Sequence, residues 1–401
     1  MRRPWITGSR SSYRRQHGRI AEILVESLRG DTWQAPSPRL RELSKGCPLT
    51  GLAEAAAFHG IGGYVAQAFR RLPEAVDPAL RDRLNSLCYH AVAGHMRAIH
   101  DLGRLRELLD RDAGTWAVVK GPVLSEAVYS LPGLRSYRDL DLVIAPARFA
   151  RTVESLERAG WKVLVTDWWP RGGKDLSGEI PLRSPSGSVV DLHWHLLNYQ
   201  RERAAFTLPM GEILRHVREV RIGGRAVPTL DEPDTLLHLA LHGCISGGNR
   251  LVWLKDIEQC IANTAPDWST VVDRARRWGT ALVTAVMLAK ARRVVNAQVP
   301  DEVLRDLAPG RAWMRLSGLA GRVAPVEAAT DRGSFDRLVT RATRANLASS
   351  SHELLLRSSA WAAASLPRHV VPPKRTGVAT LDGRSTFFEA VSQAVHTAAP
   401  Q

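Results

Sequence analysis

The sequence predicts an α+β fold in which a small mixed β-sheet is flanked by an N-terminal and a C-terminal helical region. Strand-like apolar or alternating segments concentrate between residues 113 and 200 and interleave there with helical ones, which favours a mixed sheet with helices on one face. The long segments on either side repeat their apolar residues at helical spacing. With 401 residues, 44% of them hydrophobic, the chain can bury a sizeable core and form two or three subdomains.

The N-terminal part is predicted to be basic and then helical. Residues 1–17 contain no acidic residue and are rich in arginine and serine, which predicts a disordered basic arm. Across residues 18–112 apolar side chains recur every three or four positions, and residues 78–111 form one long segment of this kind. We expect this region to be a helical lid or support.

The predicted α/β core, residues 113–200, begins with a strand, a glycine and a helix. Residues 116–120 form a short apolar strand, and Gly121 opens a helix with Pro122 in its first turn. Free backbone N–H groups and the helix dipole both favour phosphate at such a point, and Lys120 adds a positive charge. Lys120 and Gly121 are therefore predicted to form an anion site.

Two carboxylates, Asp139 and Asp141, stand one residue apart in the next predicted strand. Because side chains alternate faces along a strand, both acids point one way while Leu140, Leu142 and Ile144 point the other. Two negative charges on one face call for a cation, and oxygen ligands favour Mg²⁺ or Mn²⁺. A solvated edge strand is the alternative.

A second alternating strand places Asp191, His193 and His195 on one face. If this strand lies beside the one with the acid pair, Asp191 becomes a third carboxylate. Three acids around one or two metal ions are a site suited to nucleotidyl transfer.

The remaining chain is predicted to be helical again. Residues 201–370 form a C-terminal helical domain with a short β excursion near residues 221–227, and residues 371–401 form a loosely packed tail that contains Pro372 and Pro373. A zinc alternative rests on His238 and His242, four residues apart on one helix, but no glutamate of a protease motif and no cysteine pair accompanies them. We favour hydrogen-bonded histidines that are buried or line a cleft.

Three segments of the predicted core together resemble the uncharacterised nucleotidyltransferase family of the polymerase-β-like superfamily. They are Val118-Val-Lys-Gly-Pro-Val-Leu, Gly133-Leu-Arg-Ser-Tyr-Arg-Asp-Leu-Asp-Leu-Val143 and Val190-Asp-Leu-His-Trp194. The resemblance extends to Ala57-Phe-His59-Gly-Ile, to Leu237-His238 and to Arg250-Leu-Val-Trp-Leu-Lys-Asp256-Ile. The superfamily's Gly-Ser helix start is replaced by Gly121-Pro122, which removes a hydroxyl and one N–H from the phosphate cradle.

The resemblance implies a Mg²⁺- or Mn²⁺-dependent enzyme that moves a nucleoside monophosphate from an NTP to an acceptor, which these residues do not identify. It implies that Asp139, Asp141 and Asp191 are catalytic metal ligands, and that Lys120, Gly121, Arg135 and Lys255 bind the nucleotide. For Arg138 a surface ion pair is an equal alternative to a phosphate contact. A degenerate fold that binds nucleotide, RNA or a partner protein, and a kinase-like phosphoryl transferase, remain the alternatives.

Composition limits the partners and the compartment. The formal net charge of +15 favours polyanionic binding partners. A basic surface that contacts only solvent is the alternative explanation of this charge. Four cysteines without Cys-x-x-Cys spacing fit a reducing, cytoplasmic compartment, and no apolar stretch reaches the length of a membrane span.

Overall fold

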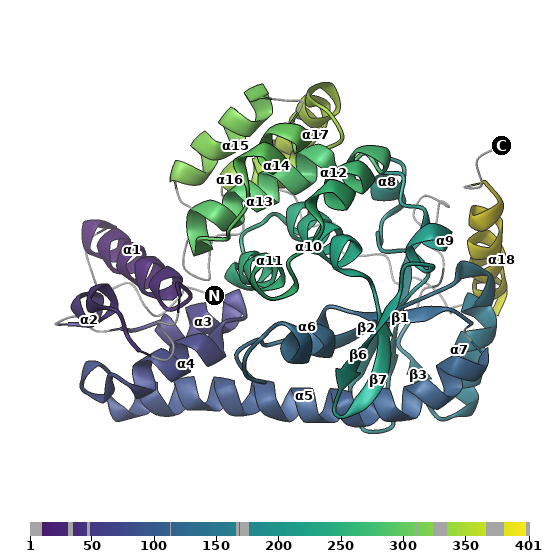
Figure 1. Cartoon of the computed structure of the whole chain (residues 1–401), viewed down its shortest axis with the longest axis horizontal. Coiled ribbons are helices and arrows are strands. Elements are labelled where there is room, and N and C mark those ends of the chain that lie inside the picture. Colours follow the sequence, from purple (N-terminus) through teal and green to yellow (C-terminus); the bar gives the residue numbers. More distant parts are fainter. Residues whose placement is uncertain are drawn as a thin grey trace.

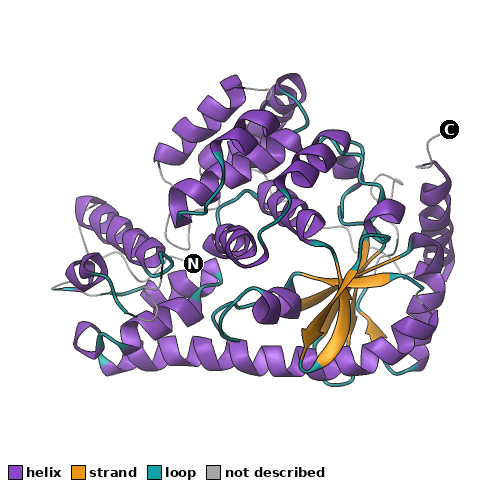
Figure 2. Ribbon diagram, in the orientation of Figure 1, coloured by secondary structure: helices purple, strands orange, loops and turns teal. Residues whose placement is uncertain are grey.

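The computed structural model confirms the predicted α+β class, with 63% helix and one mixed sheet of seven strands. It describes residues 10–30, 35–45, 49–112, 114–165, 168, 176–308, 311–323, 335–365 and 381–397. Figures 1 and 2 show the sheet on one side of the molecule, with helices around it. None of the described helices combines the length and the apolar character that crossing a bilayer requires.

The sheet has the strand order β3-β4-β5-β2-β1-β7-β6. Its strands are β1 (Trp116–Val119), β2 (Asp139–Ile144), β3 (Lys162–Val163), β4 (Glu179–Arg183), β5 (Val189–His193), β6 (Arg218–Ile222) and β7 (Arg225–Thr229). The neighbours β2 and β5 run parallel, as do β1 and β7, and the other neighbouring pairs are antiparallel. The β excursion predicted near residues 221–227 is thus part of a hairpin that extends the central sheet.

The N-terminal helices lead into one long helix that runs beneath both the N-terminal helices and the sheet (Figure 1). They are α1 (Arg10–Glu26), α2 (Pro38–Ser44), α3 (Leu52–His59), α4 (Gly62–Arg70), the 3-10 turn η1 (Pro73–Ala75) and the long helix α5 (Pro78–Asp112). Because α1 already begins at Arg10, the prediction of disorder through residue 17 is wrong for residues 10–17, while residues 1–9 lie outside the described part.

Several helices lie between the strands, and further helices form the C-terminal part. The connecting helices are α6 (Gly121–Ala127), η2 (Pro146–Arg148), α7 (Phe149–Arg158), α8 (Gln200–Arg203) and α9 (Met210–Ile213). The C-terminal helices are α10 (Glu232–Ser246), α11 (Leu251–Thr264), α12 (Trp268–Arg277), α13 (Ala281–Val295), α14 (Asp301–Leu307), α15 (Arg311–Val323), α16 (Phe335–Ala342), α17 (Leu347–Ser365) and α18 (Leu381–Thr397).

The two faces of the sheet belong to different hydrophobic clusters. Leu140, Leu142 and Ile144 of β2 are buried with apolar residues of α5, α7 and α18. Val143, which points the other way, is buried with residues of α4, α10 and α11. The alternation predicted for β2 is therefore present, and the face that carries the acids is turned toward the C-terminal helices.

The chain end is better packed than predicted. Helix α18 lies beside α7 (Figure 1), and its Phe387 and Val391 are only 2% and 1% exposed. Arg384 also forms an ion pair with Glu157 of α7. The expectation of a loose tail is wrong for residues 381–397, and residues 371–380 lie outside the described ranges.

Candidate active site

The three predicted acids lie on one face of the sheet. Asp141 and Asp191 are register partners on the parallel strands β2 and β5, so their side chains project side by side. Asp139 precedes Asp141 by two residues and projects in the same direction. All three line a cleft of about 800 Å³, whose other walls come largely from α3, α10, α11 and α16.

Asp141 is the buried member of the three and already has cationic neighbours. Its Oδ1 lies 3.1 Å from Lys120 Nζ and 3.2 Å from His193 Nε2. Burial alone would raise the pKa of Asp141, but Lys120 and His193 outweigh burial and hold the pKa well below its usual range. Asp141 is therefore ionised at neutral pH.

Asp139 and Asp191 are less well compensated. Burial, together with the negative charges of Glu179 and Asp139, raises the pKa of Asp191 to about 7. Burial, followed by the charge of Asp141, also raises the pKa of Asp139. The face of the sheet that carries Asp139, Asp141 and Asp191, here called the acidic face, thus has more negative charge than its immediate neighbours balance.

His193 connects this face to β4. Its Nδ1 lies 3.1 Å from Glu179 Oε2, while its Nε2 faces Asp141. Burial by itself lowers the pKa of His193, but the two carboxylates raise it above its ordinary value. Glu179 was not recognised in the sequence, because only the antiparallel pairing of β4 with β5 brings it beside His193.

The backbone between β1 and α6 adopts a strained turn at the edge of the cleft. Lys120 has φ 55° and Gly121 has φ 26°, in the left-handed region that a lysine rarely occupies. This turn directs the ammonium group of Lys120 toward Asp141. Lys120 and Gly121 both line the cleft, so the structure brings them together with the acids.

Arg135 reaches the cleft wall but is held by a buried carboxylate. Its Nε and Nη2 donate to the two oxygens of Asp256 at 2.7 and 2.9 Å, and Tyr129 Oη donates to the same group at 2.7 Å. With its guanidinium edge bound in this way, Arg135 is placed to support the cleft rather than to clamp a phosphate.

Lys255 is not brought into the cleft. It is 2% exposed, and its Nζ lies 3.0 Å from the Leu28 carbonyl and 2.6 Å from Glu258 Oε2. It does not line the cavity, because its face of α11 packs against the N-terminal helices. The predicted contact between Lys255 and the nucleotide is therefore not supported by this geometry.

A comparison with models of protein families gives a match over much of the chain. The family model described as "Uncharacterised nucleotidyltransferase" matches residues 49–296, more than half of the chain. The chain belongs to this family. A crystal structure of an antigenic nucleotidyltransferase-like protein from Paracoccidioides brasiliensis is similar at 16% identity with a TM-score of 0.29, covering 49% of this chain and 93% of the other. The comparison with curated proteins gives no match.

The part that matches the nucleotidyltransferase family extends from just before α3 to the end of α13. It therefore includes every strand of the sheet, the three acids and the α10–α11 side of the cleft. Helix α16, which supplies another wall, lies outside the matched part.

Two histidines of α10, His238 and His242, line the same cleft in this member of the family. Burial, reinforced by the charge of Lys120, lowers the pKa of His238 to about 3 and that of His242 well below its usual range. Both therefore line the cleft as neutral side chains. The Nε2 atom of His238 is buried and has no hydrogen-bond partner among the described residues, so the expectation of hydrogen-bonded histidines is wrong at this atom. His195 lies beyond the end of β5, where its Nδ1 accepts a hydrogen bond from Leu197 N at 3.0 Å.

Arg250, at the start of α11, is a cleft residue to which the sequence analysis gave no role. Its guanidinium lies 5.2 Å from the ring of Phe58 and 5.6 Å from that of Trp253. Burial lowers the pKa of Arg250, nearby Arg138 lowers it further, and Asp139 opposes them. The sequence signal that could have identified Arg250 as a cleft residue is its place in the Arg-Leu-x-Trp segment.

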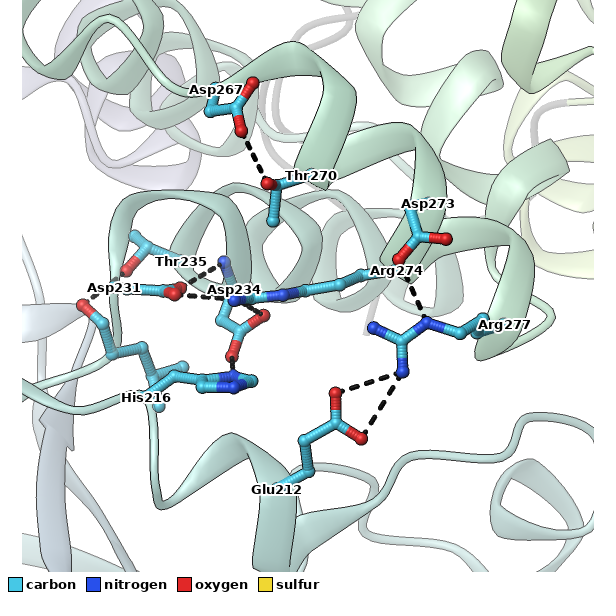
Figure 3. A network of polar contacts seen from close by, with 11 residues as sticks. Glu212, His216, Asp231, Asp234, Thr235, Asp267, Thr270, Asp273, Arg274 and Arg277 are labelled. Carbon is cyan, nitrogen blue, oxygen red and sulfur yellow. Dashed lines mark hydrogen bonds and ion pairs between the residues drawn. The ribbon is translucent and has the colours of Figure 1, made fainter.

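Another acidic group lies outside the cleft, at the start of α10 (Figure 3). Among the described residues, His216, Asp231 and Asp234 are the set of three metal-ligating side chains whose ligand atoms already lie within 4.8 Å of one another. However, Arg274 Nη1 lies 2.7 Å from Asp231 and 2.6 Å from Asp234. The guanidinium already supplies the positive charge, so this group is best explained as a structural ion pair.

Proposed function

We propose that the protein is a Mg²⁺- or Mn²⁺-dependent nucleotidyltransferase that moves a nucleoside monophosphate from an NTP to a hydroxyl or phosphate group of an acceptor. The observation that carries this proposal is the pairing of Asp141 with Asp191 on adjacent parallel strands, with Asp139 on the same face of the same cleft. Family membership supports the reaction class.

The acidic face fits a divalent cation. Asp139, Asp141 and Asp191 offer hard carboxylate oxygens. The raised pKa values of Asp139 and Asp191 reflect first their burial and then neighbouring negative charge, which a cation would offset. Their ligand atoms do not yet lie within 4.8 Å as a set, so side-chain rotation would accompany binding. Bound there, the ion would offset the charge that develops on the transferred phosphoryl group.

The chain's own residues would orient the substrate and move a proton. Lys120, beside Asp141, and Arg250, whose pKa the charge of Asp139 influences, both line the cleft, where positive charge attracts a triphosphate. Asp191, which β5 supplies beside Asp141, is the carboxylate placed to accept the proton of an attacking hydroxyl. Arg135 would hold the cleft wall through Asp256.

The direct test is Mg²⁺-dependent binding and transfer with each of the four NTPs. Wild type, Asp139→Asn and Asp141→Asn would be compared with Asp82→Asn, which alters an exposed acid of α5 outside the cleft. We expect the two cleft variants to lose Mg²⁺-dependent NTP binding and the control to retain it. Equal binding in all four proteins would overturn the proposed role of the acids.

The position of the label in the NTP separates the reaction classes. With a cell extract as the source of acceptors, nucleotidyl transfer moves an α-phosphate label into product, whereas a kinase moves only a γ-phosphate label. A non-catalytic binding module would bind NTP without dependence on Mg²⁺ and transfer neither label. The replacement of Gly-Ser by Gly121-Pro122 favours that alternative, because Pro122 lacks an N–H for phosphate.

A further inference from the structure

Two arginines that line the cleft, Arg138 and Arg250, form no ion pair with any of the described residues. By contrast, Lys120 and Arg135, which line the same cleft, are each paired with an acid. The sequence left Arg138 open between a surface ion pair and a phosphate contact. Within the described part of the chain the surface ion pair is not formed, so the phosphate contact is the alternative that remains.

The two arginines come from different segments and meet near Asp139. Arg138 directly precedes β2, and Arg250 directly precedes α11. Burial and then the charge of Arg138 lower the pKa of Arg250, whereas the charge of Asp139 raises it. Charges influence one another in this way only when they are near. Two like charges held together at the wall of a cleft favour a bound anion.

Aromatic rings hold Arg250 in place. Its guanidinium lies 5.2 Å from the centre of the Phe58 ring and 5.6 Å from that of the Trp253 ring. A guanidinium held over aromatic faces keeps the N–H groups at its edge free for hydrogen bonds. Arg138 is exposed. The two side chains together offer about ten N–H donors, which suits a ligand with many phosphate oxygens.

The glycine turn before α6 offers fewer donors than its sequence suggested. Pro122 has no N–H, and α6 has only seven residues, so its dipole is small. The ring of Tyr137 covers one side of the turn, since a Cβ at Gly121 would lie 3.6 Å from two of its atoms. His95 holds this ring, with Nδ1 2.8 Å from Tyr137 Oη. A triphosphate therefore needs donors from elsewhere in the cleft.

We propose that Arg138 and Arg250 together bind the β- and γ-phosphates of the NTP, the diphosphate group that the reaction releases. This inference rests on the proposed nucleotidyl transfer and adds to it which end of the substrate these arginines hold. Each guanidinium would donate to two phosphate oxygens in parallel, a geometry that gives strong charge-assisted hydrogen bonds.

The position of Asp191 favours this end of the substrate. In the proposed reaction the acceptor oxygen bonds to the α-phosphorus, and its proton passes to Asp191. The bond to the bridging oxygen breaks, and pyrophosphate leaves with that electron pair on the opposite side of the α-phosphorus. Asp191 is on β5, whereas Arg138 adjoins Asp139 on the neighbouring strand β2. This separation favours the acceptor beside Asp191 and the leaving group at the arginines.

The test compares ligands that contain a diphosphate group with ligands that lack it. Inorganic pyrophosphate, the four NTPs and the four matching NMPs are titrated calorimetrically, with Mg²⁺, into the full chain. The proteins are wild type, Arg138→Gln, Arg250→Lys and the control Arg97→Gln, which alters an exposed arginine of α5. Arg138→Gln decides the question, because an exposed side chain without an ion pair to the described residues contributes little to folding.

We expect wild type and Arg97→Gln to bind pyrophosphate and at least one NTP. Arg138→Gln should weaken both at least about tenfold and change the affinity for the matching NMP by no more than about twofold. Arg250→Lys should also weaken both, because an ammonium group keeps the charge but cannot make two parallel hydrogen bonds. Unfolding would lower the affinity for the NMP as well, so a selective loss identifies a contact with the diphosphate.

Pyrophosphate affinity that is absent, or that Arg138→Gln leaves unchanged, would overturn the inference. If NTP binding still required Mg²⁺ and the acids, the proposed function would stand. Equal losses for NTP and NMP would also count against the inference, because the arginines would then act on the α-phosphate or the nucleoside. Pyrophosphate binding in a wild type without Mg²⁺-dependent NTP binding would instead refute the proposed function, and with it the NTP as the ligand of these arginines.

Discussion

Substitution of Asp191 by asparagine should stabilise the metal-free protein at alkaline pH. The folded protein raises the pKa of Asp191 from 3.8 to about 7, because burial and the charges of Glu179 and Asp139 oppose its ionisation. A raised carboxyl pKa means that the folded state holds the proton more tightly than the unfolded state does. The contribution of Asp191 to stability is therefore full below about pH 4 and is lost as the pH rises through about 7.

The size of the effect follows from the pKa values. A rise from 3.8 to about 7 corresponds to a ceiling of about 4 kcal/mol, since one pH unit is worth about 1.4 kcal/mol. Asp191 is only partly buried, and its proton is shared electrostatically with neighbouring acids, so solvent screening reduces the expected penalty to about 1–2 kcal/mol. Asparagine keeps the shape of the side chain and cannot ionise.

The assay is urea unfolding of wild type, Asp191→Asn and the control Asp82→Asn at several pH values between 4 and 9, with EDTA or with Mg²⁺. In EDTA at pH 8, Asp191→Asn should be more stable than wild type by about 1–2 kcal/mol, with the gain disappearing toward pH 4. Mg²⁺ should stabilise wild type more than Asp191→Asn. An Asp191→Asn protein that is less stable at pH 8, or a difference that does not vary with pH, would refute the description of the acidic face.

Three further substitutions test the packing that holds the cleft, each by urea unfolding at neutral pH. Asp256→Asn should destabilise the protein by about 3 kcal/mol or more, because it leaves Arg135 charged and buried without its carboxylate; a loss below about 1 kcal/mol would contradict this. Phe387→Ala should cost about 3–5 kcal/mol, and an unchanged midpoint would show that α18 does not pack on α7 as described. Lys290→Met should cost about 3–5 kcal/mol by leaving Asp336 unpaired, and Lys290→Met/Asp336→Leu should recover part of that loss.

The arrangement of Asp139 and Asp141 could be predicted from local sequence. The position of the third acid, Asp191, could not. Because side chains alternate with a period of two, the placement of Asp139 and Asp141 on one face follows from their spacing. The position of Asp191 beside Asp141 depends on the parallel pairing of β2 with β5 across some fifty residues, which spacing does not determine. Alternation along the second strand offered Asp191 only on the condition that the two strands pair, and the family resemblance supported that condition.

The expectations for Lys255 and for the tail failed because local sequence does not show against which partner a helix face packs. Lys255 was expected in the cleft from its place in a motif, but the partner against which each face of α11 packs decides where its side chain lies. The tail was expected to be loose because of Pro372 and Pro373. Phe387 and Val391, four residues apart, were the helical signal on the far side of those prolines that indicated a packed face.

The ion pair between Arg135 and Asp256 suggests why motif residues need not touch a ligand. Arg135 lies in the loop that enters β2, and Asp256 lies on α11, 121 residues later. Tyr129, just after α6, donates to the same carboxylate, so three segments meet at one buried group. The acids are on the sheet and Arg250 directly precedes α11, so the contact between Arg135 and Asp256 fixes the distance between the acids and Arg250. A change at Asp256 should therefore alter the proposed NTP binding as well as stability, although Asp256 is almost fully buried.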